Sequence, residues 1–445
     1  MGAGKTTIGR EVARLTQRPF VDTDEVIQAR HGPIARIFEE EGEGEFRRLE
    51  EDVAREALIS ARPAVIALGG GAVTSSSTRD LLREQAYTVW LVVEPDDAWS
   101  RVRATDRPLA QDERDFRRLF ADREGLYASA CDARALTVED VLLGSLRISS
   151  APPGLPARAA VVADEHVLRL HGPPLGARVH PVPAGEAAKS PAVLHRLWAE
   201  LRMGRAGVLV AFGGGSTTDV AGFAAATYLR GVEWVAWPTT LVGQVDAAIG
   251  GKTGINLEHG KNLVGAFHFP SAVVIDPSVL STLPERERRN GMAEVVKTGL
   301  LAGKEVWNLA DEEMIRACAA FKSAVVLADP YERTGRRAVL NLGHTFAHAL
   351  ETASGYSIPH GEAVALGLLA ALRLSGLETD VVQEVLRPVP VRVDPERAWA
   401  ALERDKKALD GRIRLVLLER PGEPVFPVEL PADEVRRALA ALIAD

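Results

Sequence analysis

Cysteine, aromatic residues and long apolar runs are all scarce in this chain of 445 residues. Its two cysteines, Cys131 and Cys318, lie far apart and match no metal-ligand spacing, so the sequence indicates neither a disulfide framework nor a thiolate metal site. Aromatic residues make up 5% of the chain and hydrophobic residues 46%, which is typical of a globular protein rich in Ala, Val and Leu. We expect about two or three domains in a reducing compartment.

No stretch is basic or apolar enough for a nucleic-acid or membrane partner. The net charge of -8 is spread along the chain without a block of Lys and Arg. The longest apolar runs, such as residues 363–372, are shorter than the roughly 20 residues that cross a bilayer, and we find no signal peptide. The expected partners are therefore small molecules, and the expected location is cytoplasmic.

A linker divides the chain near residue 150. Residues 148–160 hold three prolines and a glycine, a composition typical of linkers. Residues 1–147 alternate short apolar runs with charged helical stretches, which predicts a parallel α/β layer. The alternation continues through residues 161–284, and helical periodicity dominates residues 285–445. The predicted fold class is α/β, with a first α/β domain, a Rossmann-like α/β domain and a mainly helical domain.

A phosphate-binding loop stands at the first residues. The segment GAGKTT, residues 2–7, runs directly into an amphipathic stretch that predicts a helix. Backbone N–H groups of such a loop cradle phosphate oxygens, the Lys5 ammonium reaches the terminal phosphates, and the Thr6 hydroxyl ligates magnesium. A glycine-rich helix start without a ligand is the alternative. The nucleotide-binding prediction covers Gly2, Gly4, Lys5, Thr6 and Thr7.

Three further segments follow in the first domain. Asp22 and Asp24 end a short apolar run, at the carboxyl end of a predicted strand, where ligands collect in open α/β sheets. The segment EGEFRRLE supplies Arg48, and LGGGAV supplies a glycine backbone that a ligand can approach closely. In this order, the segments resemble shikimate kinase over residues 1–145. The resemblance implies a P-loop kinase-type parallel sheet and the transfer of phosphate from ATP to shikimate.

The kinase resemblance also implies residue roles. Thr6 and Asp22 would hold magnesium. Arg107, on a mobile lid, would stabilise the transferring phosphoryl group, because such transfer is catalysed mainly by positioning and charge neutralisation. The implied shikimate-binding residues are Asp24, Arg48, Gly69, Gly70, Gly71 and Arg123.

The kinase half departs from the family pattern at Met1. In the family an apolar strand and a first loop glycine precede this motif, so the central first strand of the sheet is missing from the residues as printed. A parallel sheet without its central strand leaves backbone groups unpaired. We expect either a true start upstream or an impaired kinase half. A chain that begins at Met1 should then phosphorylate shikimate weakly or not at all.

Glycine-rich loops mark the second domain. Gly213, Gly214 and Gly215 follow an apolar run and precede a small-residue helix, which suits a pyrophosphate approached by backbone. Because the spacing is not G-x-G-x-x-G, a dinucleotide loop, a phosphate loop and a structural tight turn all remain open. Later glycine-rich loops contain Lys252 and Lys261, which we interpret as receptors for phosphate or carboxylate, with plain surface lysines as the alternative.

Three histidines and a glutamate point to a metal. The segments AEVVKTG, NLGHTFAHALE and HGEAV supply Glu294, His344, His348 and His360, and nitrogen with oxygen donors suits a zinc-like ion. His344 and His348 stand four apart and share one face of a predicted helix, so spacing alone predicts that both bind the metal. Three satisfied core histidines are the alternative.

Together these segments resemble 3-dehydroquinate synthase over about residues 160–440. The resemblance assigns zinc or cobalt to Glu294, His344 and His360 and leaves His348 free for proton transfer, with His348 as a metal ligand the remaining alternative. It implies that bound NAD accepts a hydride from 3-deoxy-D-arabino-heptulosonate 7-phosphate. Phosphate is then eliminated, the hydride is returned, and an intramolecular aldol step closes the ring of 3-dehydroquinate.

The synthase resemblance assigns the other site residues. Substrate oxygens would contact Asp246, Lys252, Lys297, Lys322, Arg337 and Asn341. NAD would contact Glu186, Lys189, Gly213, Gly214, Gly215, Asp219, Thr239, Thr240, Lys261 and Asn262. Arg230 would reach the neighbouring subunit's site in a homodimer, and either Lys406 or Lys407 would face the ligand. Ala247 stands where serine is common in the family, and we expect this difference to affect substrate affinity.

The predicted function is a fused enzyme of aromatic amino-acid biosynthesis, with a shikimate kinase domain before a 3-dehydroquinate synthase domain. The two reactions are not consecutive in the shikimate pathway, so the fusion does not imply direct handover of product. One rival is a related sugar-phosphate cyclase or zinc polyol dehydrogenase with the same metal and NAD constellation. Another is a non-catalytic, docking or stabilising role for the kinase-like half.

Overall fold

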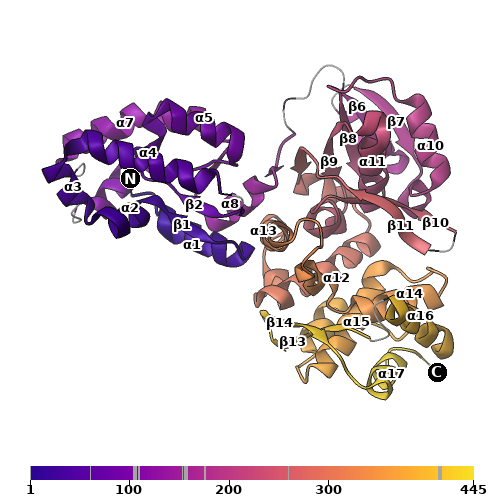
Figure 1. The fold of residues 1–445 in the computed structure, drawn as a ribbon. Helices are drawn as coiled ribbons and strands as arrows, with labels where there is room; N and C mark the ends of the chain where they lie inside the picture. The colour runs from indigo at the N-terminus through magenta and orange to yellow at the C-terminus, as the bar shows by residue number, and fades with distance from the viewer. Residues whose placement is uncertain are drawn as a thin grey trace. The chain divides into compact units, whose positions relative to one another are not determined.

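The computed structural model describes residues 2–60, 62–103, 108, 111–152, 154, 159–174, 177–258, 260–408 and 413–444. They form two compact units, within residues 1–145 and within residues 146–445 (Figure 1). Each unit combines helices with parallel strands, so the predicted α/β fold class is confirmed. Among the described helices, none is long and apolar enough to cross a membrane.

The first unit surrounds two short pairs of parallel strands with helices. Strand β1 pairs with β2, and β3 pairs with β4. In the described residues of this unit no strand joins the two pairs, as expected for a sheet without its central strand. The elements are α1 (Lys5–Thr16), β1 (Phe20–Asp22), α2 (Thr23–His31), α3 (Ile34–Glu40), α4 (Gly42–Leu58), β2 (Val65–Ala67), η1 (Ala72–Thr74), α5 (Ser76–Gln85), β3 (Val89–Leu91), α6 (Pro95–Val102), α7 (Glu113–Ala130), β4 (Ala133–Ala135) and α8 (Val138–Ser145).

Sequence signals explain where the helices of this unit begin. Asp22 ends β1 and caps α2, since its carboxylate accepts hydrogen bonds from the backbone N–H groups of Asp24 and Glu25. Helices α2, α3 and α4 then bury Ile27, Ile37 and other apolar side chains against one another. The strand-to-helix turn that carries the predicted magnesium ligand is therefore fixed both by its cap and by packing.

The second unit begins with a six-stranded parallel sheet in the order β5-β12-β9-β8-β6-β7. Residues 148–149 of the predicted linker form its edge strand β5. The elements are β5 (Ile148–Ser149), β6 (Ala160–Asp164), α9 (Glu165–His171), β7 (Arg178–Val182), η4 (Gly185–Ala188), α10 (Pro191–Glu200), β8 (Val208–Gly213), α11 (Gly215–Thr227), η5 (Tyr228–Arg230), β9 (Glu233–Pro238), η6 (Gly243–Ala247), β10 (Lys252–Leu257), β11 (Gly260–Phe267), β12 (Ala272–Val274) and η7 (Pro277–Thr282).

The central strands of this sheet are buried on both faces. All six residues of β8 are buried, as expected for a parallel strand that is covered on both sides. Helix α11 packs on β8 and β9 and has eight buried residues. The antiparallel hairpin β10–β11 then leaves the sheet and packs on α11 through β10 (Figure 1).

Helices dominate the remainder of the second unit, as predicted. The elements are α12 (Glu285–Ala302), η8 (Val306–Asn308), α13 (Asp311–Ala328), η9 (Arg336–Asn341), α14 (His344–Ala353), α15 (His360–Leu374), η10 (Val382–Leu386), α16 (Pro395–Ala408), β13 (Leu415–Arg420), β14 (Glu423–Val428) and α17 (Ala432–Ala440). The antiparallel hairpin β13–β14 interrupts the helices, which the helical periodicity of residues 285–445 does not predict. Helices α14 and α15 approach closely, since a Cβ on Gly367 would lie 2.0 Å from the Gly343 carbonyl oxygen.

Candidate functional site

Three helices of the second unit bring Glu294, His344 and His360 together. Glu294 lies in the middle of α12, whereas His344 and His360 are the first residues of α14 and α15. One ligand atom from each residue lies within 4.8 Å of the other two. The Oε1 atom of Glu294 is 3.4 Å from His344 Nε2 and 3.3 Å from His360 Nε2. The residues that the resemblance predicted as metal ligands therefore converge.

The hydrogen bonds of the two imidazoles fit this group to a cation. His344 Nδ1 lies 3.2 Å from the Leu342 carbonyl oxygen, so it carries the hydrogen and leaves a lone pair on Nε2. His360 Nδ1 lies 3.5 Å from Glu351 Oε2, which favours the same tautomer. When both imidazoles are neutral, as metal ligands must be, two nitrogen lone pairs and a carboxylate oxygen face one another, and a shared cation would satisfy them.

Burial and neighbouring charges change the acidity of all three groups. Burial and the Lys297 ammonium lower the pKa of His344 to about 4. Burial opposes protonation of His360, but its contacts with Glu294 and Glu351 outweigh this and raise its pKa to about 9. Burial also disfavours the Glu294 carboxylate, yet Lys297 and His344 hold its pKa well below the usual range. The glutamate is thus an anion that is ready for a cation.

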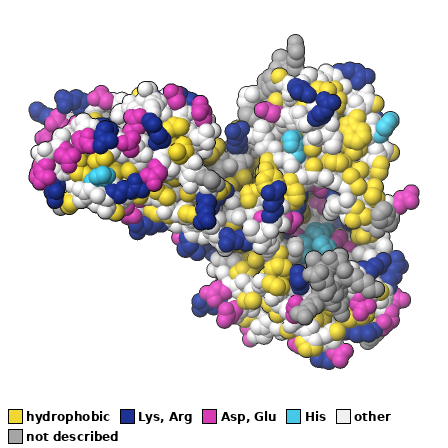
Figure 2. All heavy atoms as spheres, viewed as in Figure 1, with side chains coloured by type: hydrophobic (Ala, Val, Ile, Leu, Met, Phe, Trp, Pro, Cys, Tyr) yellow, Lys and Arg dark blue, Asp and Glu magenta, His cyan; other side chains and the backbone are white. Residues whose placement is uncertain are grey.

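His348 does not join the ligand group, although the spacing of His344 and His348 predicted that it would. Its ring packs edge-on against His344 with 5.5 Å between centroids, and its side chain is exposed. The ligand atoms of Glu294, His344 and His360 lie within 4.8 Å of one another, and His348 is not part of this group. Histidine side chains and acidic side chains meet at the surface of this unit (Figure 2). The geometry favours His348 as an accessible side chain beside the ligand group and not as a metal ligand.

Two lysines, Lys297 buried and Lys322 half-buried, meet an aspartate beside the metal-ligand group. Lys297, 2% exposed, contacts Glu294 and lies 3.3 Å from Asp246 Oδ2. Lys322 also contacts Asp246. Burial and the nearby Arg337 guanidinium lower the pKa of Lys322 to about 7. Asp246 lies in the π-helical turn η6, so the turn places a carboxylate where the two ammonium groups converge.

Other predicted substrate contacts lie on the loops around this cluster. Arg337 is buried and donates hydrogen bonds to the carbonyl oxygens of Gly250, at 3.1 Å, and Pro330, at 3.0 Å. Lys252 is half exposed and pairs with Glu332 at 2.6 Å. Asn341 is exposed at the end of η9. Protein contacts hold Arg337 and Lys252 in place, and the exposed polar groups of Lys252 and Asn341 are accessible to a ligand.

The predicted dinucleotide loop lies between β8 and α11. Gly213 ends the strand, Gly214 precedes the helix, and Gly215 is its first residue. The backbone N–H of Thr239 bonds to the Gly213 carbonyl oxygen at 2.9 Å, and the Thr240 side chain packs against Gly214. The carboxyl ends of β8 and β9 thus form one rim, at the helix N-terminus where a pyrophosphate binds.

A second polar cluster stands beside this rim. Lys189 is 4% exposed, pairs with Asp219 at 2.6 Å and contacts Asn262. Burial raises the pKa of Asp219. Burial acts in the same direction on Glu186, but Lys189 and hydrogen bonds from neighbouring polar groups lower its pKa overall. Lys261, on β11, lies 3.5 Å from Glu351. Four of the predicted NAD contacts, Glu186, Lys189, Asp219 and Asn262, therefore lie in one polar cluster beside the glycine loop.

The predicted interface residue Arg230 lies on a strained turn. Leu229 and Arg230 both have positive φ angles, 51° and 67°, and both side chains are exposed. Consecutive left-handed residues other than glycine are costly and often mark functional segments.

In the first unit, Thr6 and Asp22 meet as predicted. The Thr6 hydroxyl donates a 2.6 Å hydrogen bond to Asp22 Oδ2. Gly4 has a φ of 76° and precedes α1, which begins at Lys5 and continues through Thr7. Gly2 also has a positive φ, and its carbonyl oxygen accepts a hydrogen bond from Arg101. The loop and its helix N-terminus are therefore formed, and the magnesium-ligand pair lies at their side.

The structure brings Arg47, not Arg48, to the glycine loop. Arg48 points outward, with its side chain 59% exposed, and pairs with Glu45 and Asp52. Arg47 is 22% exposed, bonds to Glu50 at 2.5 Å, and its guanidinium fills the space that a Cβ on Gly71 would need. The sequence-based prediction named Arg48, the other residue of this adjacent pair. Each arginine has a carboxylate three residues later, Glu50 or Glu51, so spacing alone does not distinguish them.

Other predicted shikimate residues surround the same loop. Asp24 lies next to Gly69, whose N–H donates to Thr23. Arg123 is 6% exposed and donates to the Gly70 carbonyl oxygen at 3.2 Å, as does the Tyr127 hydroxyl at 2.6 Å. Three predictions, on Arg107 and on the side chains of Lys406 and Lys407, lie outside the described residues.

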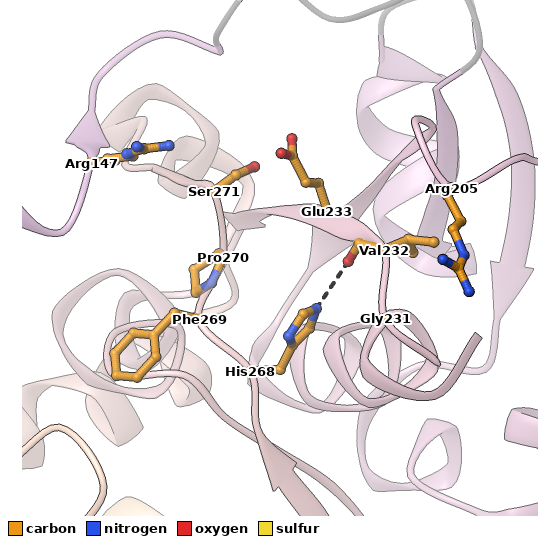
Figure 3. Close-up of a pocket in the computed structure, with 9 residues that line it drawn as sticks. All are labelled: Arg147, Arg205, Gly231, Val232, Glu233, His268, Phe269, Pro270 and Ser271. Atoms are coloured by element: carbon orange, nitrogen blue, oxygen red, sulfur yellow. Dashed lines mark hydrogen bonds between the residues drawn. The ribbon is translucent and has the colours of Figure 1, made fainter. Parts of the chain in front are cut away.

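One cavity lies beside the predicted shikimate residues, and another lies away from the predicted NAD and metal residues. A cavity of about 560 Å³ is lined by Arg47, Gly71 and the first turn of α5, beside the predicted shikimate residues. Another, of about 520 Å³, is lined by Arg147, Arg205, Glu233 and His268 (Figure 3). It lies at the amino ends of β9 and β12, whereas the predicted NAD residues follow the carboxyl ends. The second cavity is therefore not part of the metal centre.

Comparisons with known proteins match three successive parts of the chain. Family descriptions match residues 1–141 as shikimate kinase, residues 179–290 as 3-dehydroquinate synthase N-terminal and residues 291–408 as 3-dehydroquinate synthase C-terminal. The bifunctional shikimate kinase/3-dehydroquinate synthase of Thermotoga maritima is 33% identical, over 97% of each chain. The 3-dehydroquinate synthase of Symbiobacterium thermophilum is 41% identical, over 64% of this chain and 90% of its own.

Solved structures of two other synthases share the fold of the second unit. A 2-deoxy-scyllo-inosose synthase complexed with carbaglucose-6-phosphate, NAD+ and Co2+ has a TM-score of 0.58 and 25% identity, over 65% of this chain and 92% of its own. ValA, a 2-epi-5-epi-valiolone synthase from Streptomyces hygroscopicus with NAD+ and Zn2+ bound, has a TM-score of 0.53 and 28% identity, over 65% and 91%.

Proposed function

Because this chain belongs to the bifunctional shikimate kinase/3-dehydroquinate synthase family, we propose that Glu294, His344 and His360 hold the catalytic metal of its synthase reaction. The second unit converts 3-deoxy-D-arabino-heptulosonate 7-phosphate to 3-dehydroquinate and phosphate, with NAD and zinc or cobalt as cofactors. The observation that carries the proposal is the convergence of these three side chains, with their lone pairs facing one another. A metal held by three protein ligands keeps coordination positions open and polarises a substrate hydroxyl.

Cationic side chains beside the metal ligands suit an acidic substrate. Lys297 and Lys322 would bind substrate oxygens, and Asp246 between them would orient a hydroxyl group. Arg337, Lys252 and Asn341 would complete the binding of phosphate, carboxylate and hydroxyl oxygens. His348 is exposed next to His344 and would move a proton at the substrate.

The glycine rim and the Lys189 cluster would seat NAD. The pyrophosphate fits against the N–H groups of Gly214 and Gly215 at the start of α11. Asp219 and Lys189 form one buried ion pair next to this loop, and Glu186, Thr239, Thr240, Lys261 and Asn262 surround it. This arrangement places the dinucleotide loop at the carboxyl edge of the sheet, where open α/β folds bind such ligands.

The first unit is a shikimate kinase domain that uses ATP with magnesium. We assign the phosphate-binding loop to Gly2, Gly4, Lys5, Thr6 and Thr7, with Thr6 and Asp22 at magnesium. Shikimate would contact Asp24, Arg123 and the Gly69–Gly71 backbone, together with Arg47 in place of Arg48. The bidentate guanidinium of Arg47 suits a hydroxyl or carboxylate ligand at the cavity beside Gly71.

We further propose a homodimer in which Arg230 reaches the neighbouring subunit's site. The exposed and conformationally strained turn at Leu229 and Arg230 supports this role, because strain of this kind persists where it serves binding. The cytoplasmic location stays a prediction.

A phosphate-release assay tests the synthase assignment. We expect the purified chain to release phosphate from heptulosonate phosphate with NAD present, and a chelator to abolish the release until zinc or cobalt is restored. Release that continues undiminished in the metal-free protein would refute the metal site. A polyol that reduces NAD in the same protein, without turnover of heptulosonate phosphate, would favour the rival dehydrogenase.

A further inference from the structure

Glu351 lies between a metal-ligand histidine and a lysine of the β10–β11 hairpin. Its side chain, on α14, is 6% exposed. The Oε2 atom is 3.5 Å from His360 Nδ1, and the Oε1 atom is 3.5 Å from Lys261 Nζ. Burial opposes its ionisation, but His360 and Lys261 lower the pKa of Glu351 overall. A buried carboxylate persists where such partners stabilise it.

We propose that Glu351 is a positioning residue for the metal centre. Its carboxylate accepts the Nδ1 hydrogen of His360, which turns the Nε2 lone pair of that ring toward Glu294. Lys261 balances the charge of Glu351 and holds the carboxylate in place. The inference rests on the proposed metal site, and it adds an acidic residue outside the ligand group.

The Nδ1 atoms of the two histidines have different partners, and only that of His360 depends on a side chain. His344 is 11% exposed, and the backbone carbonyl of Leu342 orients its Nδ1 atom. His360 is 37% exposed at the start of its helix, and the partner of its Nδ1 atom is the Glu351 carboxylate. A carboxylate that accepts the second N–H of a ligand histidine fixes its tautomer and increases its basicity. His360 therefore depends on a residue that substitution can remove.

The same carboxylate connects the metal centre to the proposed dinucleotide cluster. Lys261 precedes Asn262, and Asn262 contacts Lys189 of the Lys189–Asp219 pair. The Lys261 ammonium also lies 4.5 Å from the ring centroid of Tyr356, just after α14. Contacts thus run without interruption from His360 through Glu351 to the hairpin that borders the NAD rim.

Metal affinity measured without turnover tests this inference. We expect Glu351→Ala to weaken Co2+ binding by about 10- to 100-fold and to change the visible absorption spectrum of the bound ion. Glu351→Gln keeps an acceptor in place and should recover part of the affinity. The matched control is Glu362→Gln, an exposed carboxylate on the same helix as His360, which should match the unsubstituted protein. Circular dichroism of the metal-free variants monitors the fold.

A double variant tests the role of Lys261. Lys261→Met should weaken Co2+ binding in the unsubstituted protein but not in Glu351→Ala, because its effect passes through the carboxylate. Additive effects, or a Glu351→Ala protein that binds Co2+ as tightly as Glu362→Gln, would overturn the inference. Glu294→Gln in the same assay separates the two levels of the argument. If it too leaves the affinity unchanged, the proposed metal site fails; if it alone weakens binding, only the role of Glu351 fails.

Discussion

The two catalytic centres of this chain handle charge in different ways. The synthase centre buries its charged groups, with the Glu294 and Lys297 side chains 1% and 2% exposed and held by fixed neighbours. The kinase centre combines a buried arginine, Arg123, which is 6% exposed, with Arg47, which is 22% exposed on the face of a helix. A buried anionic group with converging lone pairs requires a cation as part of its structure. The kinase centre, in contrast, is completed by its nucleotide and substrate.

The comparison is tested most strongly by removing one metal ligand. His360→Ala should reduce metal affinity by more than about 100-fold, since losing only an outer partner of a ligand costs about 10- to 100-fold, and turnover should be lost with the metal. His348→Ala is the matched histidine control and should keep its metal while losing rate. Metal content by atomic absorption, measured with phosphate release, checks both. Equal metal loss in the two variants would return His348 to the ligand group.

Metal removal should destabilise one unit only. At a free metal concentration of 100 times Kd, binding stabilises the folded state by about 2.7 kcal/mol. A chelator should therefore lower the unfolding temperature of the second unit by several degrees, whereas the first unit has no ligand group of this kind among its described residues. Differential scanning calorimetry of the whole chain resolves the two transitions. If the chelator also lowered the unfolding temperature of the first unit, the contrast between the two centres would be wrong.

Arg47→Ala should weaken shikimate binding by about 10- to 100-fold, because a hydrogen bond to a charged group contributes about 1.5 to 3 kcal/mol. Arg48→Ala, on the same helix and already paired with Glu45 and Asp52, should leave the affinity within about twofold, as expected for an exposed ion pair. Calorimetric titration with shikimate measures both variants. The opposite ranking would restore the sequence-based choice of Arg48.

Residue patterns predicted more of the synthase centre than of the kinase centre. The metal ligands stand in three separate segments, and the family resemblance assigned them, because helical spacing alone would have placed His348 on the metal. Spacing failed there because the positions of Glu294 on α12 and His360 on α15, which no local pattern fixes, decide which histidine of α14 joins the group. Arg47 and Arg48 are adjacent, and only the packing of α4 decides which one faces the glycine loop. Glu351 ends the segment NLGHTFAHALE, but its role depends on tertiary contacts that no local pattern contains.

The smallest effect on metal affinity is expected from a hydrogen bond next to a metal ligand that does not involve the ligand itself. Asn290, one turn before Glu294 on α12, accepts a 3.2 Å hydrogen bond from the backbone N–H of Gly361, the residue after His360. Asn290→Ala removes this cap of α15 and should lower the free energy of unfolding by about 1 kcal/mol, with a loss of metal affinity of less than about tenfold. Asn308→Ala, whose side chain bonds only locally to Glu305, is the control for amide removal. Urea unfolding with parallel metal titration measures both quantities. Suppose instead that metal affinity falls by more than about tenfold while the free energy of unfolding changes by about 1 kcal/mol. The start of α15 itself, and not only the two carboxylate partners of His360, would then align that histidine.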